Sequence, residues 1–240
     1  MTISLRTGVS TNPIELSIIV PVLNEIEVLP KFIAHLKKHW NPSHELLIVD
    51  VGSIDGSWEW LKTHLDSGVY QTAAGRGSQM NFGAQKASKK WLYFVHIDSQ
   101  LPKSYDLHIT KAIQEGAQSG CFRLKFDRAN WLLRRAAAGS RWNHPLFRGG
   151  DQSLFVSKQG FDTLGGYDLR YEVCEDINLI KKLYATANFR VLTQPIQTSS
   201  RRFYKNGVTR LLIHFGVLHL SHWLGAGPHF LKNYYLKFVR

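Results

Sequence analysis

Cysteine is scarce in this sequence of 240 residues, and Cys121 and Cys174 are its two cysteines. They form no Cys-x-x-Cys pair, so the sequence predicts neither a disulfide framework nor a zinc site and favours a reducing compartment. Long apolar runs are also missing: the sequence has no stretch of eighteen apolar residues, the length that a membrane-spanning helix needs. Residues 1–15 are polar and lack the apolar core of a secretion signal. We therefore expect a cytoplasmic protein.

Acidic residues are few, with 18 Asp and Glu against 30 Lys and Arg, and the formal net charge is +12. This excess indicates an acidic partner: nucleic acid, an anionic membrane surface or a phosphorylated substrate. No zinc-finger, RNA-recognition or basic-zipper signature occurs, so we expect no nucleic-acid partner. With 44% hydrophobic residues and no low-complexity tract, the chain is expected to fold as one large α/β domain, or as a core with a C-terminal appendage.

The stretch Trp91–Gln100, W-L-Y-F-V-H-I-D-S-Q, predicts a strand buried on both faces that ends on His96 and Asp98. Ligands of open α/β sheets bind outside the carboxyl ends of parallel strands, so Asp98 is placed to hold a metal or a polar ligand. Alternatively, Asp98 caps the turn before the following Leu-Pro pair.

Strands and helices alternate along the first half of the chain. The run that begins at Leu16 is β-branched and apolar, and apolar residues then recur at helical spacing from Val28 to Leu36. A second such unit starts with the strand Glu45–Asp50, and a short third strand covers Val69–Thr72. This alternation predicts a doubly wound, mostly parallel sheet with helices on both faces.

Polar clusters follow three of these strands. They are Asn24 with Glu25, Asp50 with Ser53 and Asp55, and His96 with Asp98. Turn chemistry explains each cluster separately, but it does not explain why all three lie at one predicted edge of the sheet. The sequence has no G-x-G-x-x-G fingerprint after a strand and no Walker lysine, so a different kind of nucleotide site is favoured.

Two later segments carry further candidates. Arg148-Gly-Gly-Asp-Gln152 contains paired glycines that permit close backbone approach to a ligand. Glu172, Glu175 and Asp176 precede a predicted helix, where acids also complement the helix dipole.

The last segment is both basic and apolar. Arg201 and Arg202 suit a diphosphate, because guanidinium groups bind phosphate oxygens bidentately; the alternative is a solvated pair on a surface strand. Residues 208–224 are largely apolar with cations on both sides, so this helix lies either on a membrane surface or over the core.

Together these motifs resemble the family 2 glycosyltransferases of GT-A fold. The similarity rests on S-I-I-V-P-V-L-N-E, I-V-D-V-G-S-I-D-G, H-I-D in place of D-x-D, G-G-D-Q and E-D-I-N-L, and it covers residues 16–203. The pieces G-R-G-S-Q-M-N and S-S-R-R-F-Y-K-N-G resemble a bacterial subgroup of small, single-domain members. The resemblance implies a GT-A domain over residues 1–203 and a C-terminal helical extension over residues 204–240.

The resemblance also implies the activity and the residues that carry it. An inverting, hexosyltransferase-class enzyme would move a sugar from a nucleotide-diphospho-sugar to an acceptor hydroxyl, assisted by Mg²⁺ or Mn²⁺. Residues implied on the donor side are Pro21, Glu25, Asp50, Arg76, Asp98, Arg201 and Arg202, with Asp98 as the metal ligand. Residues implied on the acceptor side are Gly150, Asp151, Gln152 and Glu175, with Asp176 as the catalytic base. His96 replaces the first acid of D-x-D, which leaves its contact with ribose or metal open.

Two other functions compete with this interpretation. A nucleotidyltransferase also uses an α/β fold and metal-bound acids, but its glycine-rich, lysine-containing N-terminal signature is missing. The other is a non-catalytic, basic module that binds a membrane surface on a decayed transferase fold, an interpretation motivated by His96 and the apolar tail. For the transferase as well, an anionic membrane surface is a candidate partner of the segment 204–240, with a peripheral location on the inner face of the membrane.

Overall fold

The computed structural model describes residues 13–73, 75–186 and 188–239. Residues 1–12, 74, 187 and 240 lie outside these ranges. The prediction that residues 1–15 carry no secretion signal therefore falls mostly outside the described residues. The strands are β1 (Leu16–Val22), β2 (Glu45–Asp50), β3 (Val69–Gln71), β4 (Trp91–Phe94), β5 (Ser119–Phe126), β6 (Leu154–Ser157) and β7 (Phe189–Thr198). The helices are α1 (Leu29–Lys38), α2 (Ser57–His64), α3 (Arg76–Lys86), α4 (Tyr105–Gln114), α5 (Trp131–Gly139), α6 (Lys158–Thr163), α7 (Glu175–Thr186), α8 (Arg201–Asn206), α9 (Val208–Trp223) and α10 (Pro228–Phe238), with the short 3₁₀ turns η1 (Pro145–Phe147) and η2 (Gly150–Gln152).

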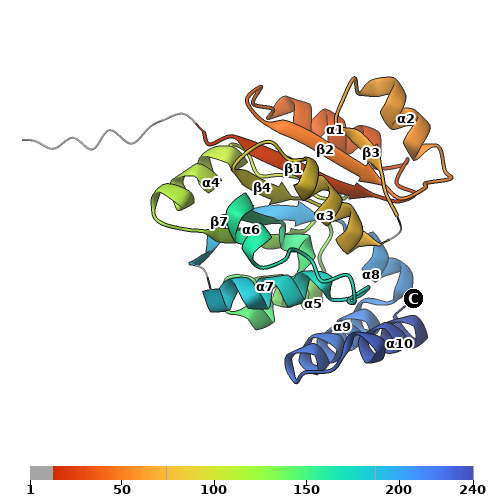
Figure 1. Cartoon of the computed structure of the whole chain (residues 1–240). Coiled ribbons are helices and arrows are strands. Elements are labelled where there is room, and N and C mark those ends of the chain that lie inside the picture. The colour runs from red at the N-terminus through yellow and green to blue at the C-terminus, as the bar shows by residue number, and fades with distance from the viewer. Residues whose placement is uncertain (1–12, 74, 187, 240) are drawn as a thin grey trace, which may run out of the picture.

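The strands form one seven-stranded sheet in the order β3-β2-β1-β4-β6-β5-β7 (Figure 1). The first four of these strands are parallel, and β7 is parallel to β5. Strand β6 runs antiparallel to both of its neighbours, β4 and β5. The predicted mostly parallel sheet with helices on both faces is therefore confirmed, and β6 makes it a mixed sheet.

The direction of β6 positions the segment before it. In the antiparallel register Phe94 pairs with Leu154, so the start of β6 lies beside the end of β4. The turn η2 immediately precedes β6. The G-G-D-Q motif is thereby brought to the same edge of the sheet as His96 and Asp98.

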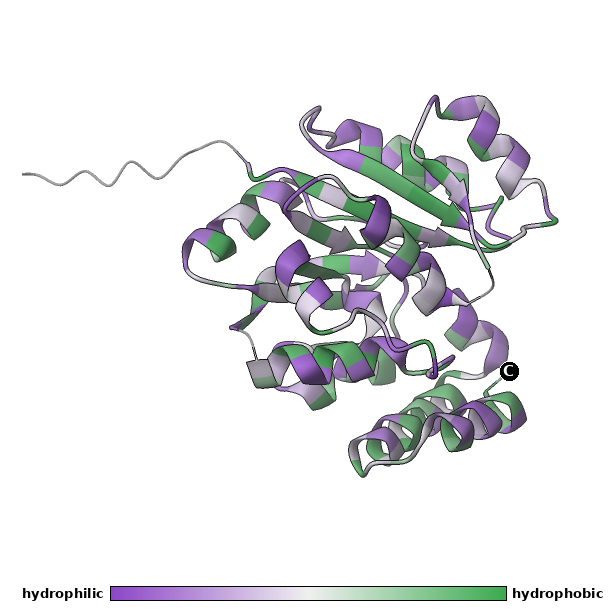
Figure 2. Ribbon diagram, in the orientation of Figure 1, coloured by the Kyte–Doolittle hydropathy of each residue, from purple (hydrophilic) through white to green (hydrophobic). Residues whose placement is uncertain are grey.

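Side chains of the central strands alternate between two apolar layers, as the pleat requires. On β1, Ile18 and Val20 pack with helices α1, α2 and α4, whereas Ile19 packs with α3, α6 and α7. On β4, Tyr93 belongs to the first layer and Phe94 to the second. Figure 2 shows the corresponding concentration of apolar residues in the strands. The predicted burial of this strand on both faces is confirmed.

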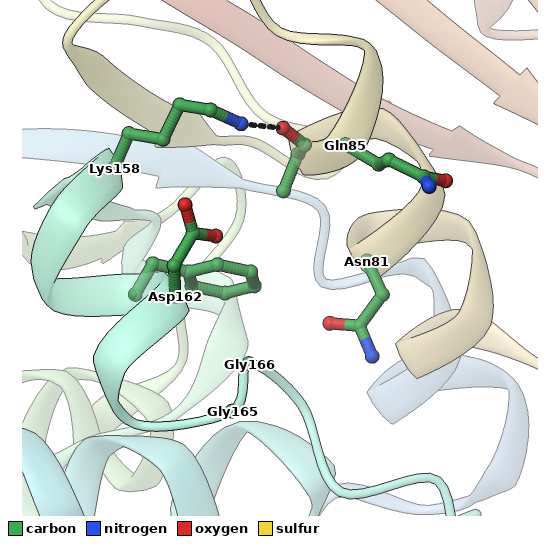
Figure 3. A pocket seen from close by; sticks show the side chains of 8 residues that line it. Asn81, Gln85, Lys158, Asp162, Gly165 and Gly166 are labelled. Carbon is green, nitrogen blue, oxygen red and sulfur yellow. Dashed lines mark hydrogen bonds between the residues drawn. The ribbon is translucent and has the colours of Figure 1, made fainter.

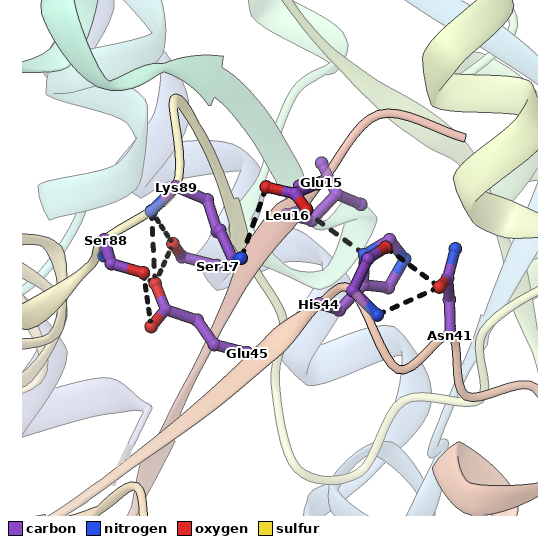
Figure 4. Close-up of polar contacts among 9 residues, drawn as sticks. Glu15, Leu16, Ser17, Asn41, His44, Glu45, Ser88 and Lys89 are labelled. Carbon is purple, nitrogen blue, oxygen red and sulfur yellow. Dashed lines mark hydrogen bonds and ion pairs between the residues drawn. The ribbon is translucent and has the colours of Figure 1, made fainter. Parts of the chain in front are cut away.

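A separate polar network holds the amino ends of β1 and β2 (Figure 4). The Glu45 carboxylate accepts hydrogen bonds from the Ser88 amide (2.6 Å) and from the Ser17 hydroxyl. Lys89 in turn contacts Glu15 at 3.2 Å. These contacts tie the loop before β4 to β1 and β2 at the opposite edge from the polar clusters, and they give this network a structural role.

The C-terminal helices form a third apolar cluster beside the sheet. Leu211 and Leu218 of α9 and Leu231 of α10 are buried in it, together with Phe126 and Leu133. Figure 1 shows α9 and α10 lying side by side next to α5 and α7. Among the described residues, no helix is long and apolar enough to cross a membrane. The predicted boundary at residue 203 falls inside α8, which also holds Arg201 and Arg202 on a helix rather than on a surface strand.

Candidate active site

The loops that follow β1 and β2 are joined by hydrogen bonds. The Asn24 amide donates to Ser53 Oγ (2.8 Å), and Asn24 Oδ1 accepts from the Ile54 amide (2.9 Å). The Ile26 amide donates to Asp55 Oδ2 at 3.0 Å. Asn24 adopts a positive φ of 54°, a conformation that asparagine tolerates better than most residues. The first two predicted clusters therefore form one connected rim.

Asp50 and Pro21 shape this rim from inside the sheet. Asp50 is fully buried, and its Oδ1 accepts hydrogen bonds from the amides of Gly52 (2.7 Å) and Ser53 (3.0 Å). Pro21 lies two residues beyond Ile19, the last residue of β1 that pairs with β4, so its missing N–H removes no hydrogen bond from that ladder. Asp50 thus stabilises the turn that follows β2. Contact of Asp50 and Pro21 with a nucleotide-sugar donor stays a prediction.

Glu25 and Arg201 bring α8 to the same edge. Their side chains approach to 3.6 Å, and Arg201 also lies 3.3 Å from Glu27. Burial raises the pKa of Glu25; Arg201 opposes this rise, and the nearby charge of Asp98 adds to it. The predicted donor residues Glu25, Asp98 and Arg201 are thus close enough to influence one another.

Asp98 and His96 lie where β4 leaves the sheet. Burial raises the pKa of Asp98, and the charge of Asp151 raises it further. His96 Nδ1 lies 3.4 Å from Asp151 Oδ1. The surrounding protein favours the neutral form of Asp151, but the hydrogen bond and charge of His96, with the charges of Arg76 and Arg202, outweigh that effect and lower its pKa.

Gly150 brings Asp176 and His96 together. Its amide donates a hydrogen bond to Asp176 Oδ2. A Cβ atom added at Gly150 would lie 2.8 Å from that oxygen and 2.9 Å from His96 Cε1, so a larger residue would displace one of them. Asp176 Oδ1 accepts from the amide of Ile177 at 2.9 Å in the first turn of α7. The predicted base is therefore held by backbone groups at the edge of the sheet.

Glu175, the residue before Asp176, is buried and faces Arg76 at 3.5 Å. Burial and the adjacent charge of Asp176 raise the pKa of Glu175 to about 7, although Arg76 opposes the rise. Arg76 begins α3 and also lies within electrostatic reach of Asp151. One guanidinium group thus faces the three acids predicted for acceptor binding and catalysis.

Gln152 is placed differently from its neighbours. It is buried, and its Oε1 accepts a hydrogen bond of 2.6 Å from Arg148 Nη1, while its Nε2 donates to the Phe147 carbonyl (2.6 Å). Arg148 is itself only 1% exposed and also donates to Cys121 Sγ (3.2 Å) and the Ser140 carbonyl (2.9 Å). In this geometry Gln152 and Arg148 brace η2, and acceptor contact by Gln152 stays a prediction.

The C-terminal helices contribute to the site through Arg202. Its Nη2 donates to the Tyr235 hydroxyl at 2.6 Å, and its guanidinium lies over the rings of Phe215 (5.4 Å) and Tyr235 (5.3 Å). The charge of Arg202 also reaches Asp151. Arg202 therefore links α9 and α10 to the edge of the sheet where η2 lies.

Sequence reasoning missed the supporting role of Arg148 and the position of His219 on α9. Burial lowers the pKa of His219, while the charges of Asp176 and Asp151 oppose this. The high histidine content of residues 208–224 is a sequence signal that could have pointed to His219. No signal marked Arg148 as buried, because its partners at residues 140–152 lie in irregular turns with no periodic pattern, and Cys121 comes from the distant strand β5.

The hollow shown in Figure 3 is a separate feature. This cavity of about 310 Å³ is lined by residues of α3, α6 and the Gly165–Gly166 turn, among them Asn81, Lys158 and Asp162. None of the predicted site residues lines it.

A divalent cation fits the edge only if a substrate completes its coordination. Within the described ranges, no group of three His, Cys, Asp or Glu residues could hold a metal. Asp98 nevertheless places a carboxyl group near Glu25 and Asp151: the charge of Asp151 raises the pKa of Asp98, and the charge of Asp98 raises the pKa of Glu25. A cation would relieve this crowding, and Mg²⁺ or Mn²⁺ takes carboxylate, water and phosphate oxygens together.

The sequence from residue 17 to residue 164 matches Glycosyl transferase family 2. This match covers more than half of the chain, and the chain belongs to that family. The membership predicted from the motifs is therefore confirmed.

Two curated relatives show how far the sequence similarity extends. A PGL/p-HBAD biosynthesis glycosyltransferase of Mycobacterium bovis is 29% identical over 182 residues, which cover 67% of this chain and 66% of the relative. The lipopolysaccharide core biosynthesis glycosyltransferase LpsC of Rhizobium meliloti is 30% identical over 94 residues, covering 37% of this chain and 33% of the relative. The chain thus spans less than two thirds of the length of these relatives.

Solved structures show the fold. TarS of S. aureus in complex with UDP has a TM-score of 0.64 at 19% identity, covering 85% of this chain and 66% of that chain. The mannosyltransferase PcManGT from Pyrobaculum calidifontis, in complex with GDP-Man and Mn²⁺, has a TM-score of 0.63 at 18% identity, covering 98% and 74%. The architecture is that of GT-A glycosyltransferases.

Proposed function

We propose that this protein is an inverting, metal-assisted glycosyltransferase that uses a nucleotide-diphospho-sugar. The observation that carries the proposal is the position of Asp176, which the Gly150 amide holds at the edge of the sheet near His96. Two groups of residues lie at the same edge of the sheet: the first is Glu25, Asp98 and Arg201, and the second is Asp151 and Glu175.

The first group is proposed to bind the donor. TarS was solved with UDP and with UDP-GlcNAc, and PcManGT with GDP-Man and Mn²⁺, so proteins of this fold hold nucleotide-diphosphate ligands. Arg201 and Arg76 would bind diphosphate oxygens, because guanidinium groups match their geometry. Asp98 would hold Mg²⁺ or Mn²⁺, which when bound neutralises charge on the diphosphate.

The second group is proposed to hold the acceptor and carry the chemical step. Asp151 and Glu175 would orient the acceptor hydroxyl, and Asp176 would take its proton as the oxygen attacks the anomeric carbon. The new C–O bond forms while the bond from that carbon to the phosphate oxygen breaks. The nucleoside diphosphate leaves from the opposite face, so the anomeric configuration inverts.

The C-terminal segment, residues 204–240, is proposed as an extension of the GT-A domain of residues 1–203, and as the part that meets an anionic membrane surface. Its cations and the link from Arg202 to Tyr235 support this placement on the acceptor side. The localisation that goes with this proposal is peripheral, on the inner face of a membrane.

The proposed transfer can be tested with a panel of nucleotide-sugars that includes UDP-GlcNAc and GDP-Man. We expect thermal stabilisation by one of them with Mn²⁺, because a ligand that binds only the native state raises its melting temperature. The same donor should release nucleoside diphosphate, and the product should have the opposite anomeric configuration. Release of pyrophosphate would instead support a nucleotidyltransferase, and binding without turnover on any acceptor tested would support a non-catalytic module.

A further inference from the structure

Large apolar side chains are exposed along one side of α9 and at Leu224, the residue that follows it. Ile213, Leu220, Trp223 and Leu224 are between 47% and 71% exposed and recur at helical spacing. The opposite side of the helix, with Leu211, is buried. Figure 2 shows apolar and polar residues alternating along α9 and α10. The helix is therefore apolar on two sides, and packing within the chain accounts for only one of them.

A second exposed apolar group, outside the C-terminal segment, continues this surface. Trp142 is 63% exposed, and its ring contacts that of Phe147 at a centroid distance of 4.9 Å. Leu146, the neighbour of Phe147 in η1, lines a small hollow together with Trp223 and Lys181. We call six exposed apolar residues, located at η1, just before it and at the end of α9, the apolar ridge: Trp142, Leu146, Phe147, Leu220, Trp223 and Leu224.

The segments that form the apolar ridge contain cations and no acid. No acidic residue occurs between Asp127 and Asp151, and none follows Asp176 to the end of the sequence. Arg141 is exposed next to Trp142, and Lys181 is exposed beside the hollow. A partner of this surface must accept both aliphatic side chains and positive charge.

We infer that the apolar ridge docks on an anionic lipid bilayer; this inference rests on the membrane contact proposed for residues 204–240 and assigns it to named side chains, three of them outside that segment. Leucine side chains would enter the acyl region, the two tryptophans would lie at the headgroup level, and arginine and lysine would bind lipid phosphates. Nucleic acid would use the cations but not the exposed leucines. A second copy of the chain would bring two cationic surfaces together, which is unfavourable.

This docking surface extends beyond the segment 204–240 to the residues that lead into η2. Phe147 lies three residues before Gly150, and the hollow lined by Leu146 and Trp223 is also lined by Ile177, the residue after Asp176. A bilayer on the apolar ridge would therefore lie on the side of the site that holds Asp151 and Asp176.

The test is sedimentation of the full chain with vesicles of phosphatidylcholine alone and with vesicles that also contain phosphatidylglycerol. We expect binding only to the anionic vesicles, and weaker binding at high salt. Trp142→Ser and Leu224→Ser should each weaken binding roughly tenfold, because each removes a large apolar contact. Leu107→Ser, which changes an exposed leucine on α4, is the matched control and should bind as the original protein does.

All three changed residues are exposed, so the variants should keep the original melting temperature. Vesicle binding needs no turnover, so its result is independent of the proposed transferase activity. Failure to bind anionic vesicles at low salt would overturn both the proposed membrane contact of residues 204–240 and this inference. Vesicle binding that is equal in all three variants would overturn the inference alone. Analytical ultracentrifugation tests the remaining alternative, which is a dimer formed through the apolar ridge. If the protein does not bind vesicles but forms a dimer that Trp142→Ser and Leu224→Ser dissociate, the ridge is an interface with a second copy of the chain.

Discussion

His96 Nδ1 lies 3.4 Å from Asp151 Oδ1, which joins the end of β4 to the turn η2. The relationship shows where the histidine of the H-I-D motif points: it contacts an acid from a segment 55 residues later in the chain. His96 also borders Gly150, whose amide holds Asp176. His96 is therefore part of the wall against which the proposed base is positioned.

The close fit at Gly150 predicts that a single methyl group impairs the chemical step. In Gly150→Ala the new Cβ would lie 2.8 Å from Asp176 Oδ2, so Asp176 or His96 must move. We expect turnover to fall roughly tenfold to a hundredfold, because small displacements of catalytic groups cost that much. The measurement is the steady-state rate of donor turnover, with donor affinity measured separately by calorimetry.

Gly149→Ala is the matched control for this prediction. A Cβ at Gly149 would meet no atom within 4 Å, and the residue has an extended backbone that alanine also adopts. Its turnover should exceed that of Gly150→Ala by a wide margin. Equal rates for the two variants would show that the contact between Gly150 and Asp176 has no catalytic importance.

Asp176→Asn keeps the shape of the side chain but removes the proposed base. Turnover should fall by roughly 10²–10⁴-fold, the range typical of general-base catalysis, while donor affinity stays close to that of the original protein. Rates and donor dissociation constants measured on the same preparation separate the two effects. Nearly full turnover, or retention of the anomeric configuration, would move the base to Asp151 or Glu175.

Asp98→Asn tests the proposed metal ligand. The affinity for nucleoside diphosphate in Mn²⁺ should fall by at least about tenfold, because a cation contributes several kcal/mol of charge stabilisation. The fold should survive: burial raises the pKa of Asp98, so its charged form is unfavourable in the folded protein and asparagine removes that cost. A metal-free melting temperature equal to or above the original one would confirm this. Unchanged Mn²⁺-dependent affinity would exclude Asp98 as the ligand.

Glu175 predicts a dependence of stability on pH. Its pKa is raised to about 7 in the folded protein from an ordinary value of 4.5. Between these values the folded state keeps a proton that the unfolded state has lost, so stability falls as pH rises from 4.5 to about 7. Between pH 5 and pH 8 the free energy of unfolding of the original protein should therefore decrease. In Glu175→Gln, which cannot titrate at this position, that decrease should be smaller by on the order of 2 kcal/mol.

Urea unfolding at pH 5 and pH 8 measures this difference. Glu172→Gln is a suitable control because Glu172 is exposed and pairs with Lys232 on the surface. The control should show the same pH dependence as the original protein. If Glu175→Gln shows it as well, Glu175 does not take up a proton in this range.

The sequence by itself determined the fold class, the family and the edge of the sheet that carries the polar clusters. Apolar runs such as the one at Leu16 and the helical spacing that follows it are local signals. Parallel strands bring their carboxyl ends to one edge, so Glu25, Asp50 and Asp98 could be grouped without coordinates. These inferences needed only the order of residues along the chain, because each depends on neighbours within one strand, turn or helix.

The tertiary structure alone decided how the acceptor side is assembled. Strand β6 enters the sheet antiparallel, and this places η2 beside the end of β4. The buried hydrogen bond from Arg148 to Cys121, the hydrogen bond from the Gly150 amide to Asp176, and the hydrogen bond from Arg202 to Tyr235 all join segments that are distant in the chain. Such contacts have no local pattern, because their free energy depends on burial and on partners that lie together only once the sheet and its helices have packed.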